Sequence, residues 1–167
     1  MTADEPRISV RPATPEDGGA LVSLIRGLAH YEKLDPPDDA AAARLVADLA
    51  DNPGRFDCLL AEIAGAVVGY ALFFETYSTF KGQPKLYLED IFVDPDHRST
   101  GAGFALFSAV GREALRRGCV ALEWAVLDWN RLALDFYEKL GGNYQREWLP
   151  YRLERDDLNR LVAGDGG

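Results

Sequence analysis

The chain has 167 residues, 47% of them hydrophobic, and a formal net charge of −9. This length and composition predict one globular domain, spanning residues 1–167, that buries a full core of its own. The acidic balance argues against a nucleic-acid partner or an anionic-membrane partner, each of which requires a basic face, and suits a cationic substrate.

The chain has two cysteines, Cys58 and Cys119, which lie far apart and form no CxxC or Cys/His group. Because only His30 and His97 are available besides, the pattern favours two reduced thiols over a disulfide, and we expect no metal site. The N-terminal MTADEPRISV lacks a basic-then-apolar leader pattern, and no long apolar span follows it. These features predict a cytoplasmic protein.

The first predicted elements are a strand over residues 7–14 and a helix that begins at Thr14. Thr14 suits the N-cap, Pro15 the first helical position, and Glu16 and Asp17 the first turn. Apolar residues then recur at helical spacing and give this helix one apolar face: Leu21, Leu24, Ile25 and Leu28.

The middle of the chain predicts mostly β-structure, because β-branched and aromatic residues dominate it. Ala64-Gly65 indicates a hairpin turn, and the acidic pair Glu89-Asp90 interrupts an otherwise apolar strand. In chain order we expect a loop and a second short helix over residues 35–54, two strands over 56–76, a mobile loop over 77–85 and a strand over 86–93.

The last third of the chain predicts two helices and two strands. In the first helix Phe104, Phe107 and Leu115 form one stripe with Leu106, Val110 and Ala114 beside it, so we expect this helix to be largely buried. Asn130 suits the N-cap of the second helix, and Gly141 or Gly142 suits its C-terminal end. In chain order we expect a helix over residues 101–117, a strand over 119–126, a helix over 130–142 and a terminal strand or hairpin over 144–153.

The segment VDPDHRSTGAGFALF connects the strand over 86–93 to the helix that follows. A first helical turn of Gly-Ala-Gly leaves unpaired backbone N–H groups uncovered, and the helix dipole adds partial positive charge there. This arrangement predicts a site for phosphate or pyrophosphate, to which Arg98 adds a charge-assisted contact. On these residues alone a plain tight turn is the alternative. The chain has no GxxxxGK[ST] loop and lacks the third glycine and the following acidic residue of a dinucleotide-binding turn.

RSTGAG, placed between a strand and a helix, resembles the acetyl-coenzyme A pyrophosphate loop (Arg-x-x-Gly-x-Gly) of the GCN5-related N-acetyltransferase (GNAT) superfamily. The segments VRPATPED, LAHYEKL, LYLEDIFV, DWN and ALDFYEKLG agree in order and spacing with its diamine branch, the spermidine/spermine acetyltransferases and their thialysine-acetylating relatives. The resemblance runs from Val10 to about Leu153.

The resemblance implies an α/β (α+β) GNAT fold: a mixed, mostly antiparallel sheet of six to seven strands, flanked by about four helices, with splayed central strands. It implies acetyl-CoA as the cosubstrate, with Asn130 on its pantetheine arm. By the same resemblance, the coenzyme-binding residues are Ile91, Phe92, Val93, Arg98, Ser99, Thr100, Gly101, Ala102, Gly103, Phe104, Asn130 and Tyr137.

Acetyl transfer to an amine needs a proton acceptor, a polarised thioester carbonyl and a proton for the departing thiolate. Glu89 is the candidate base, directly or through water, and the resemblance implies Tyr137 as the general acid. On a regular strand Glu89 and Asp90 point to opposite faces, so both reach one site only if the strand bulges. The alternatives are a solvated acidic pair, a core tyrosine at Tyr137 and a plain N-cap at Asn130.

For the substrate, the branch implies that Tyr31 and Glu32 hold the far end of a cationic amine while Glu89 and Asp90 line the near end. Where the branch usually has Asp-Pro-Trp, this chain has Ser78-Thr79-Phe80, which puts spermidine or spermine recognition in doubt. The substrate-binding candidates are Tyr31, Glu32, Phe80, Glu89, Asp90 and Tyr151.

These residues predict transfer of acetyl to a primary amine of a small cationic molecule, thialysine-like or a diamine. The alternatives are another amine, such as an amino acid, an aminoglycoside or a protein N-terminus, and an acetyl-CoA-binding module whose amine site has decayed. The resemblance also implies a homodimer. Trp148 and Tyr151 near the C-terminus suit either a wall of the amine site or the dimer contact.

Overall fold

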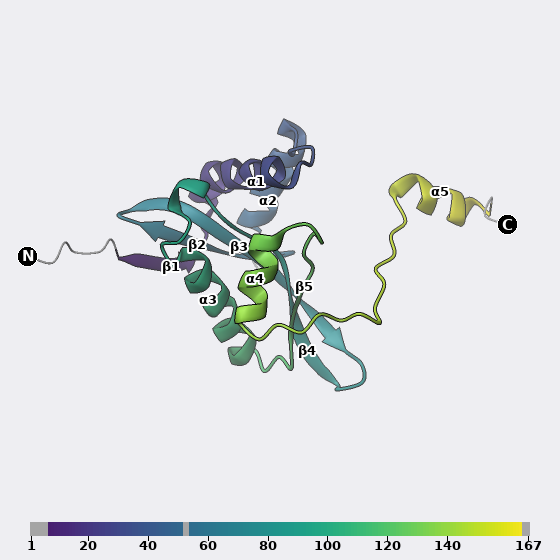
Figure 1. The fold of residues 1–167 in the computed structure, drawn as a ribbon. Coiled ribbons are helices and arrows are strands. Elements are labelled where there is room, and N and C mark those ends of the chain that lie inside the picture. The colour runs from purple at the N-terminus through teal and green to yellow at the C-terminus, as the bar shows by residue number, and fades with distance from the viewer. Residues whose placement is uncertain (1–6, 52–53, 165–167) are drawn as a thin grey trace, which may run out of the picture. The chain divides into compact units, whose positions relative to one another are not determined.

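The structure is a computed structural model that describes residues 7–51 and 54–164. It contains two compact units, Met1–Leu127 and Asp128–Gly167. The first unit is built on a five-stranded sheet with the strand order β1-β2-β3-β4-β5 (Figure 1). Its strands are β1 Ile8–Pro12, β2 Asp57–Ile63, β3 Ala66–Ser78, β4 Gln83–Val93 and β5 Leu122–Trp124.

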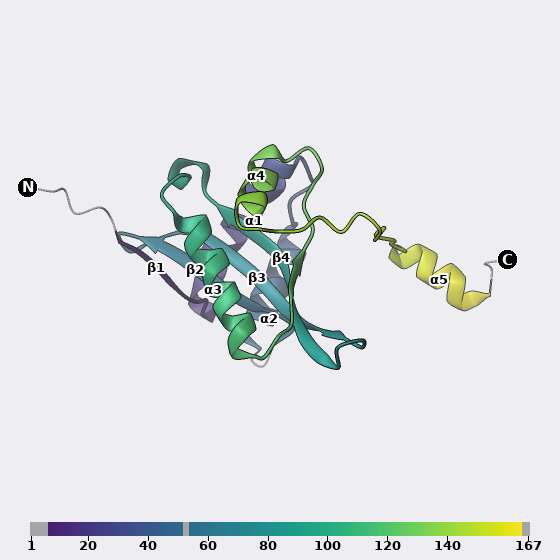
Figure 2. The ribbon, with the colours of Figure 1, turned by 60° about the horizontal axis from the view of Figure 1, so that its bottom comes forward.

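Helices cover both faces of this sheet (Figures 1 and 2). One face packs against α1 (Gly18–Glu32) and α2 (Asp39–Ala50), around a core that includes Leu21, Tyr70 and Phe92. The opposite face packs against α3 (Ala102–Arg116). Short 3-10 turns, Pro15–Asp17 and Pro95–His97, precede α1 and the α3 loop. This mixed α/β architecture confirms the expected fold class.

The strands β1 to β4 are antiparallel, and β5 runs parallel to β4. The hairpin between β2 and β3 turns at Ala64-Gly65 as predicted, with both residues at positive φ. The pairing of β3 with β4 continues to Ser78 and Gln83, so the predicted mobile loop over 77–85 is wrong. Most of that segment belongs to a hairpin that extends beyond the neighbouring strands (Figure 1), because its residues pair directly across a four-residue turn.

One extra residue in β4 changes the direction of the side chains that follow it. Leu72 pairs with Asp90 while Phe73 pairs with Leu88, so Glu89 has no opposite residue and forms a β-bulge. Before the bulge, Leu86 and Leu88 face α3. After the bulge, Phe92 packs in the α1 core, and Asp90, two residues before it, shares that face. The bulge predicted at the acidic pair is therefore present.

The helix α3 is less buried than the sequence predicts. The residues that face the sheet lie at a spacing of four, namely Ala102, Leu106, Val110 and Ala114. Phe107 packs edge-on against Trp124, with 5.3 Å between the ring centroids. Phe104 and Leu115 are exposed, because within the first unit α3 packs against the sheet on one side only. Its opposite side is not covered by another element of that unit.

The second unit contains α4 (Arg131–Lys139) and α5 (Arg155–Ala163). The Asn130 side chain accepts a hydrogen bond from the Ala133 N–H at 3.2 Å, and Gly141 has a φ of 82°, so both predicted helix boundaries are confirmed. The terminal strand predicted over 144–153 is wrong. A strand needs a partner, the described part of this unit contains no other strand, and Pro150 lacks the N–H that a ladder requires.

In the described residues the sheet therefore has five strands rather than six to seven, and there are five α-helices rather than about four. The additional helix, α5, begins with a capping box that is visible in the sequence. The Glu154 N–H donates to Asp157 Oδ2 at 3.1 Å, and Gly164 ends the helix in a left-handed conformation.

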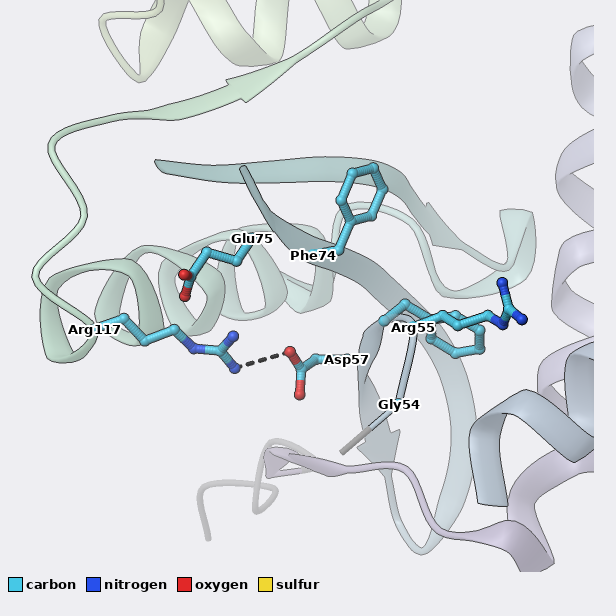
Figure 3. A pocket seen from close by; sticks show the side chains of 7 residues that line it. Gly54, Arg55, Asp57, Phe74, Glu75 and Arg117 are labelled. Atoms are coloured by element: carbon cyan, nitrogen blue, oxygen red, sulfur yellow. Dashed lines mark hydrogen bonds and ion pairs between the residues drawn. The ribbon is translucent and has the colours of Figure 1, made fainter. Parts of the chain in front are cut away.

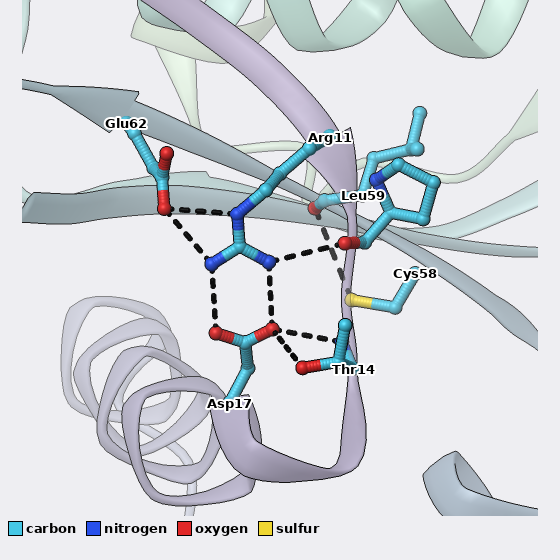
Figure 4. A network of polar contacts seen from close by, with 7 residues as sticks. Arg11, Thr14, Asp17, Cys58, Leu59 and Glu62 are labelled. Atoms are coloured by element: carbon cyan, nitrogen blue, oxygen red, sulfur yellow. Dashed lines mark hydrogen bonds and ion pairs between the residues drawn. The ribbon is translucent and has the colours of Figure 1, made fainter. Parts of the chain in front are cut away.

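Arg11 joins β1, β2 and the start of α1 through one guanidinium group (Figure 4). Its Nη1 and Nη2 donate to the two carboxylate oxygens of Asp17 at 2.7 and 2.8 Å, and its Nε donates to Glu62 Oε1 at 2.9 Å. Asp17 Oδ2 also accepts from the Thr14 N–H at 2.7 Å. The hydrogen bonds from Arg11 hold the pKa of Asp17 well below its usual range.

We expect Asp17→Asn to lower the free energy of unfolding at pH 7 by about 2 kcal/mol, because it removes a charge-assisted bidentate contact. A carboxylate with a lowered folded-state pKa contributes stability above its unfolded pKa, and that stability fades as the pH falls. The difference between the two proteins should therefore shrink below about pH 4. Urea unfolding at pH 7 and pH 3 measures both effects.

Asp39→Asn is the matched control, since the Asp39 carboxylate bonds Arg26 at 3.0 Å but is fully exposed. That variant should change stability by less than about 0.5 kcal/mol. Equal losses in the two variants would contradict the role given to the Arg11 network.

Candidate active site

The edge of β4 opens directly after the bulge. The parallel pairing with β5 joins Leu86–Leu88 to Leu122–Trp124 and ends there. In the described chain no strand pairing joins residues 89–93 to residues 125–127. The predicted splay of the central strands is therefore present, and it leaves backbone groups of Glu89 to Val93 available to a bound molecule. Of the coenzyme candidates in this strand, Phe92 is buried, whereas Ile91 and Val93 are partly buried against the α3 core.

At the start of α3, after the loop that follows β4, glycines leave the backbone uncovered by side chains. Gly101 has a φ of 94°, a conformation that glycine adopts without strain, and its carbonyl accepts the first helical hydrogen bond from Ala105 at 2.9 Å. The N–H groups of Gly103 and Phe104 precede that bond and have no acceptor within the helix. A Cβ on Gly103 would make only an ordinary contact, 3.8 Å from Val93 Cγ2, so packing does not require glycine there.

Two residues of this loop keep its shape. Thr100 Oγ1 donates to the His97 carbonyl at 2.8 Å and accepts from the Ala102 N–H at 3.4 Å. Ser99 has a φ of 62°, a left-handed conformation that is uncommon for a residue with a Cβ. The loop therefore holds local backbone strain beside the helix terminus, as binding loops often do.

Arg98 points its guanidinium at aromatic rings of the α1 face. Its Cζ lies 4.6 Å from the centroid of the Tyr31 ring and 6.0 Å from that of Phe92. These are cation–π distances. The structure thus brings the last turn of α1 against the loop that precedes α3.

The charges of two carboxylates, Glu89 and Glu32, act on Asp90 next to the bulge. Asp90 is half-buried, and the fully buried Tyr70 donates its hydroxyl to Asp90 Oδ2 at 3.1 Å. The pKa of Asp90 is raised to about 6, first by burial and then by the charges of Glu89 and Glu32, against the opposing effect of the Tyr70 hydrogen bond. Burial also raises the pKa of Glu32. Such a cluster can pair with a cationic group or accept a proton from one.

Tyr70 was not among the predicted site residues. A tyrosine in the apolar strand VVGYALFF is ordinarily a core residue, and its packing in the α1 core agrees with that view. Only the register between β3 and β4 brings its hydroxyl to Asp90. Burial, followed by the charge of Asp90, raises the pKa of Tyr70 far above its usual value, so it donates a hydrogen bond at every working pH.

Phe80 is not brought to these carboxylates within the chain. It lies in the turn of the β3–β4 hairpin and is 96% exposed. Glu89 lies six residue steps after Gln83 along β4, which span about 20 Å, so the hairpin turn and the bulge are far apart.

The remaining predicted site residues belong to the second unit. Asn130 is a buried N-cap of α4, and Tyr137 lies on the same helix with its ring edge-on to Phe136 at 5.4 Å between centroids. Tyr151 lies in the extended segment between α4 and α5 and is 93% exposed. Within the second unit, Asn130 and Tyr137 therefore belong to α4, and Tyr151 belongs to the segment that connects α4 to α5.

Two shallow hollows lie elsewhere, at the C-terminal end of α3, with volumes of about 400 and 470 Å³. Figure 3 shows the first, where Arg117 Nη2 donates to Asp57 Oδ2 at 2.9 Å. Arg117 also bonds Glu113 at 2.7 Å, so its charge is already paired within the protein. Neither hollow includes a residue of the RSTGAG loop or of the bulge.

Across residues 7–51 and 54–164, no group of three or more His, Cys, Asp or Glu side chains is arranged to hold a metal ion. In the same residues no helix is both long enough and apolar enough to span a bilayer. Cys58 and Cys119 are free, and burial raises the pKa of Cys58 to about 12, which keeps its thiol protonated.

Comparison with known proteins identifies the family. Residues 21–142 match the acetyltransferase (GNAT) family. A thialysine N-epsilon-acetyltransferase of Bos taurus is 39% identical over 167 residues, which cover 93% of this chain and 98% of that protein. The L-ornithine N5-acetyltransferase NATA1 of Arabidopsis thaliana is 39% identical over 112 residues, 66% of this chain and 49% of that protein.

A solved structure, the aminoglycoside N-acetyltransferase AAC(6')-Iy in complex with CoA, superposes with a TM-score of 0.74. It covers 93% of this chain and 99% of that chain at 22% identity, and this likeness supports the fold alone. The family match and the relatives that align over nearly the whole chain are consistent with two features of the structure, the unpaired edge of β4 after the bulge and the exposed backbone N–H groups at the start of α3. The chain belongs to the GNAT acetyltransferase family, in its thialysine and diamine branch, and is an amine N-acetyltransferase.

Proposed function

We propose that the protein transfers the acetyl group of acetyl-CoA to the ω-amino group of a thialysine-like amino acid or a diamine. The observation that carries this proposal is the half-buried Asp90, which accepts a hydrogen bond from the Tyr70 hydroxyl at 3.1 Å; burial first, and then the charges of Glu89 and Glu32, raise its pKa to about 6. A cationic amine relieves the repulsion among these carboxylates, and each ammonium group that is buried needs a carboxylate partner. The names of the similar proteins indicate the same class of amine.

The coenzyme part of the proposal uses backbone more than side chains. The N–H groups at the start of α3 bind the pyrophosphate, with Arg98 adding its charge. The absence of a Cβ at Gly103, which the packing does not require, supports this role, because bare backbone admits a phosphate closely. The open N–H groups of residues 89–93 polarise the thioester carbonyl, and Asn130 hydrogen-bonds the pantetheine arm.

In the proposed reaction Glu89 removes a proton from the ammonium through water, and the neutral nitrogen attacks the thioester carbonyl carbon. The carbon–sulfur bond then breaks, and the Tyr137 hydroxyl gives its proton to the departing sulfur. The nitrogen loses its second proton as the amide forms, and this proton restores the Tyr137 hydroxyl through solvent. The proton taken by Glu89 passes to solvent, so each turnover releases one proton. Reduced thiols and a supply of acetyl-CoA agree with a cytoplasmic setting for this chemistry.

The proposal predicts a preference among amines. With acetyl-CoA and free thiol release as the readout, kcat/KM for thialysine, ornithine or putrescine should exceed that for a simple monoamine by tenfold or more. The panel also contains lysine, spermidine, spermine and an aminoglycoside, so a preference for the aminoglycoside would contradict the substrate class. Tight acetyl-CoA binding with no turnover of any amine would indicate a decayed module instead.

Tyr137→Phe should lower kcat by about a hundredfold or more, because it removes the proton donor. Its Kd for acetyl-CoA should stay within about twofold, since the ring is kept. Tyr144→Phe is the control: Tyr144 lies in the same unit and is exposed, so its variant should match the parent protein. Equal activity of Tyr137→Phe and the parent would remove Tyr137 from the reaction.

The ionisation of Asp90 predicts a pH dependence of two properties: it favours binding of the amine and it lowers the stability of the fold. Because the ionised Asp90 binds the ammonium, the KM for the amine should rise as the pH falls through about 6. A carboxyl whose folded-state pKa is raised loses stability as the pH rises through that range, so the charge of Asp90 destabilises the fold at pH 7. Asp90→Asn should therefore raise the free energy of unfolding at pH 7 by about 1 to 2 kcal/mol and give a high, pH-independent KM.

The matched control for this variant is Asp96→Asn, an exposed carboxyl in the turn after β4. It should leave the KM, its pH dependence and the stability unchanged. A lower stability for Asp90→Asn, or a KM that still rises below pH 6, would contradict the role proposed for Asp90.

The second unit suggests a homodimer. Exposed apolar side chains gather in and after the segment that lacks a strand partner: Tyr144, Trp148, Leu149, Tyr151, Leu153, Leu158, Leu161 and Val162. A run of this kind is typical of an interface between chains. Sedimentation equilibrium should give twice the mass of the chain, and a monomer at micromolar concentration would contradict this part of the proposal.

A further inference from the structure

The last turn of α1 contributes neighbouring residues to two different parts of the site. Tyr31 lies against the guanidinium of Arg98, in the loop that leads to α3. Glu32, the next residue, acts on Asp90 through its charge. The Tyr31 ring, which the family resemblance assigns to the amine, is therefore in contact with a residue of the coenzyme loop.

The backbone on both sides of this contact is fixed. Lys33 ends α1 in a left-handed conformation with a φ of 59°, and the Leu34 N–H donates to the Ala29 carbonyl at 2.9 Å. This is the hydrogen bond of a capped C-terminal turn. The Arg98 N–H donates to the Pro95 carbonyl at 3.3 Å, which anchors Arg98 to the 3-10 turn.

Packing between α1 and β4 sets the separation of the two groups. A Cβ on Gly27 would lie 3.1 Å from Phe92 Cε1, so this glycine lets the Phe92 ring reach the helix. Tyr31 is one helical turn further along the same face. Phe92 and Tyr31 together present ring surfaces to Arg98, at 6.0 and 4.6 Å from its Cζ to the two centroids.

A cation–π contact holds a guanidinium against a ring by its charge rather than by hydrogen bonds, so it can leave the five N–H donors for another partner. Within residues 7–51 and 54–164, no hydrogen bond or ion pair involves the Arg98 side chain. Its donors are therefore available to an anion.

We infer that Tyr31 is a positioning residue for the coenzyme: its ring holds Arg98 in the orientation that binds the phosphates of acetyl-CoA. This inference rests on the proposed role of Arg98 at the pyrophosphate. It assigns the last turn of α1 to both substrates, with Tyr31 serving the coenzyme through Arg98 and Glu32 serving the amine through its charge.

Calorimetric titration with CoA tests this without any acetyl transfer. Tyr31→Leu should weaken CoA binding about fivefold, the size expected for one cation–π contact. Tyr31→Phe keeps the ring and should stay within about twofold of the parent. In an Arg98→Gln background, Tyr31→Leu should have no further effect on the Kd, since the group that it positions is gone.

Steady-state kinetics separate this role from that of an amine-site wall. Tyr31→Leu should raise the KM for acetyl-CoA and leave the KM for the amine within about twofold. An unchanged Kd for CoA together with a raised KM for the amine would overturn the inference, and so would the same fivefold loss in the Arg98→Gln background. Tyr31→Met replaces the leucine variant if that variant does not fold. A parent protein that binds no CoA at all would instead overturn the proposed function.

Discussion

The arrangement of the site depends on the single-residue bulge at Glu89. Strand side chains alternate between two faces, so a regular β4 would point Asp90 and Phe92 into the apolar core beneath α3, together with Leu86 and Leu88. The extra residue reverses the alternation at the one place where the sequence turns acidic. It directs Asp90 to the buried Tyr70 hydroxyl and Phe92 to α1. Parallel pairing with β5 ends at the residue before the bulge, so the same defect separates the strands where a thioester is proposed to bind.

The bulge makes stability and function oppose each other at Asp90. A carboxyl that is half-buried near two other carboxylates is unfavourable in its charged form, and its raised pKa expresses that cost. The Arg11 network, by contrast, lowers the pKa of Asp17 and stabilises the fold. Such a contrast between a carboxylate paired with an arginine and a carboxylate placed near other acids is typical of proteins that give up stability at a functional site.

The last turn of α1 shows why a motif alone does not assign roles. The adjacent residues Tyr31 and Glu32 resemble a pair that holds an amine, yet they interact with different residues. Consecutive residues on a helix point about 100° apart, so neighbours in sequence are not neighbours in space. The Tyr31 ring contacts Arg98 of the coenzyme loop, while the charge of Glu32 acts on Asp90. The last turn of α1 therefore contributes to both the proposed coenzyme site and the proposed amine site.

The sequence by itself determined the features that depend on local chemistry. The cap residues Thr14 and Asn130, the Ala64-Gly65 turn and the glycine-rich start of α3 were all predicted, because each follows from backbone preferences over a few residues. A bulge at the acidic pair was expected on the condition that both carboxylates reach one site, and the family resemblance implied the splayed strands. Only the tertiary structure decided which groups meet. The register of β3 and β4 brought Tyr70 to Asp90, the packing of Phe92 on Gly27 brought Tyr31 to Arg98, and the lack of a partner left residues 144–153 without strand structure. These contacts join residues far apart in the chain, and no local pattern encodes them, because the free energy that selects them comes from packing and pairing across the whole sheet.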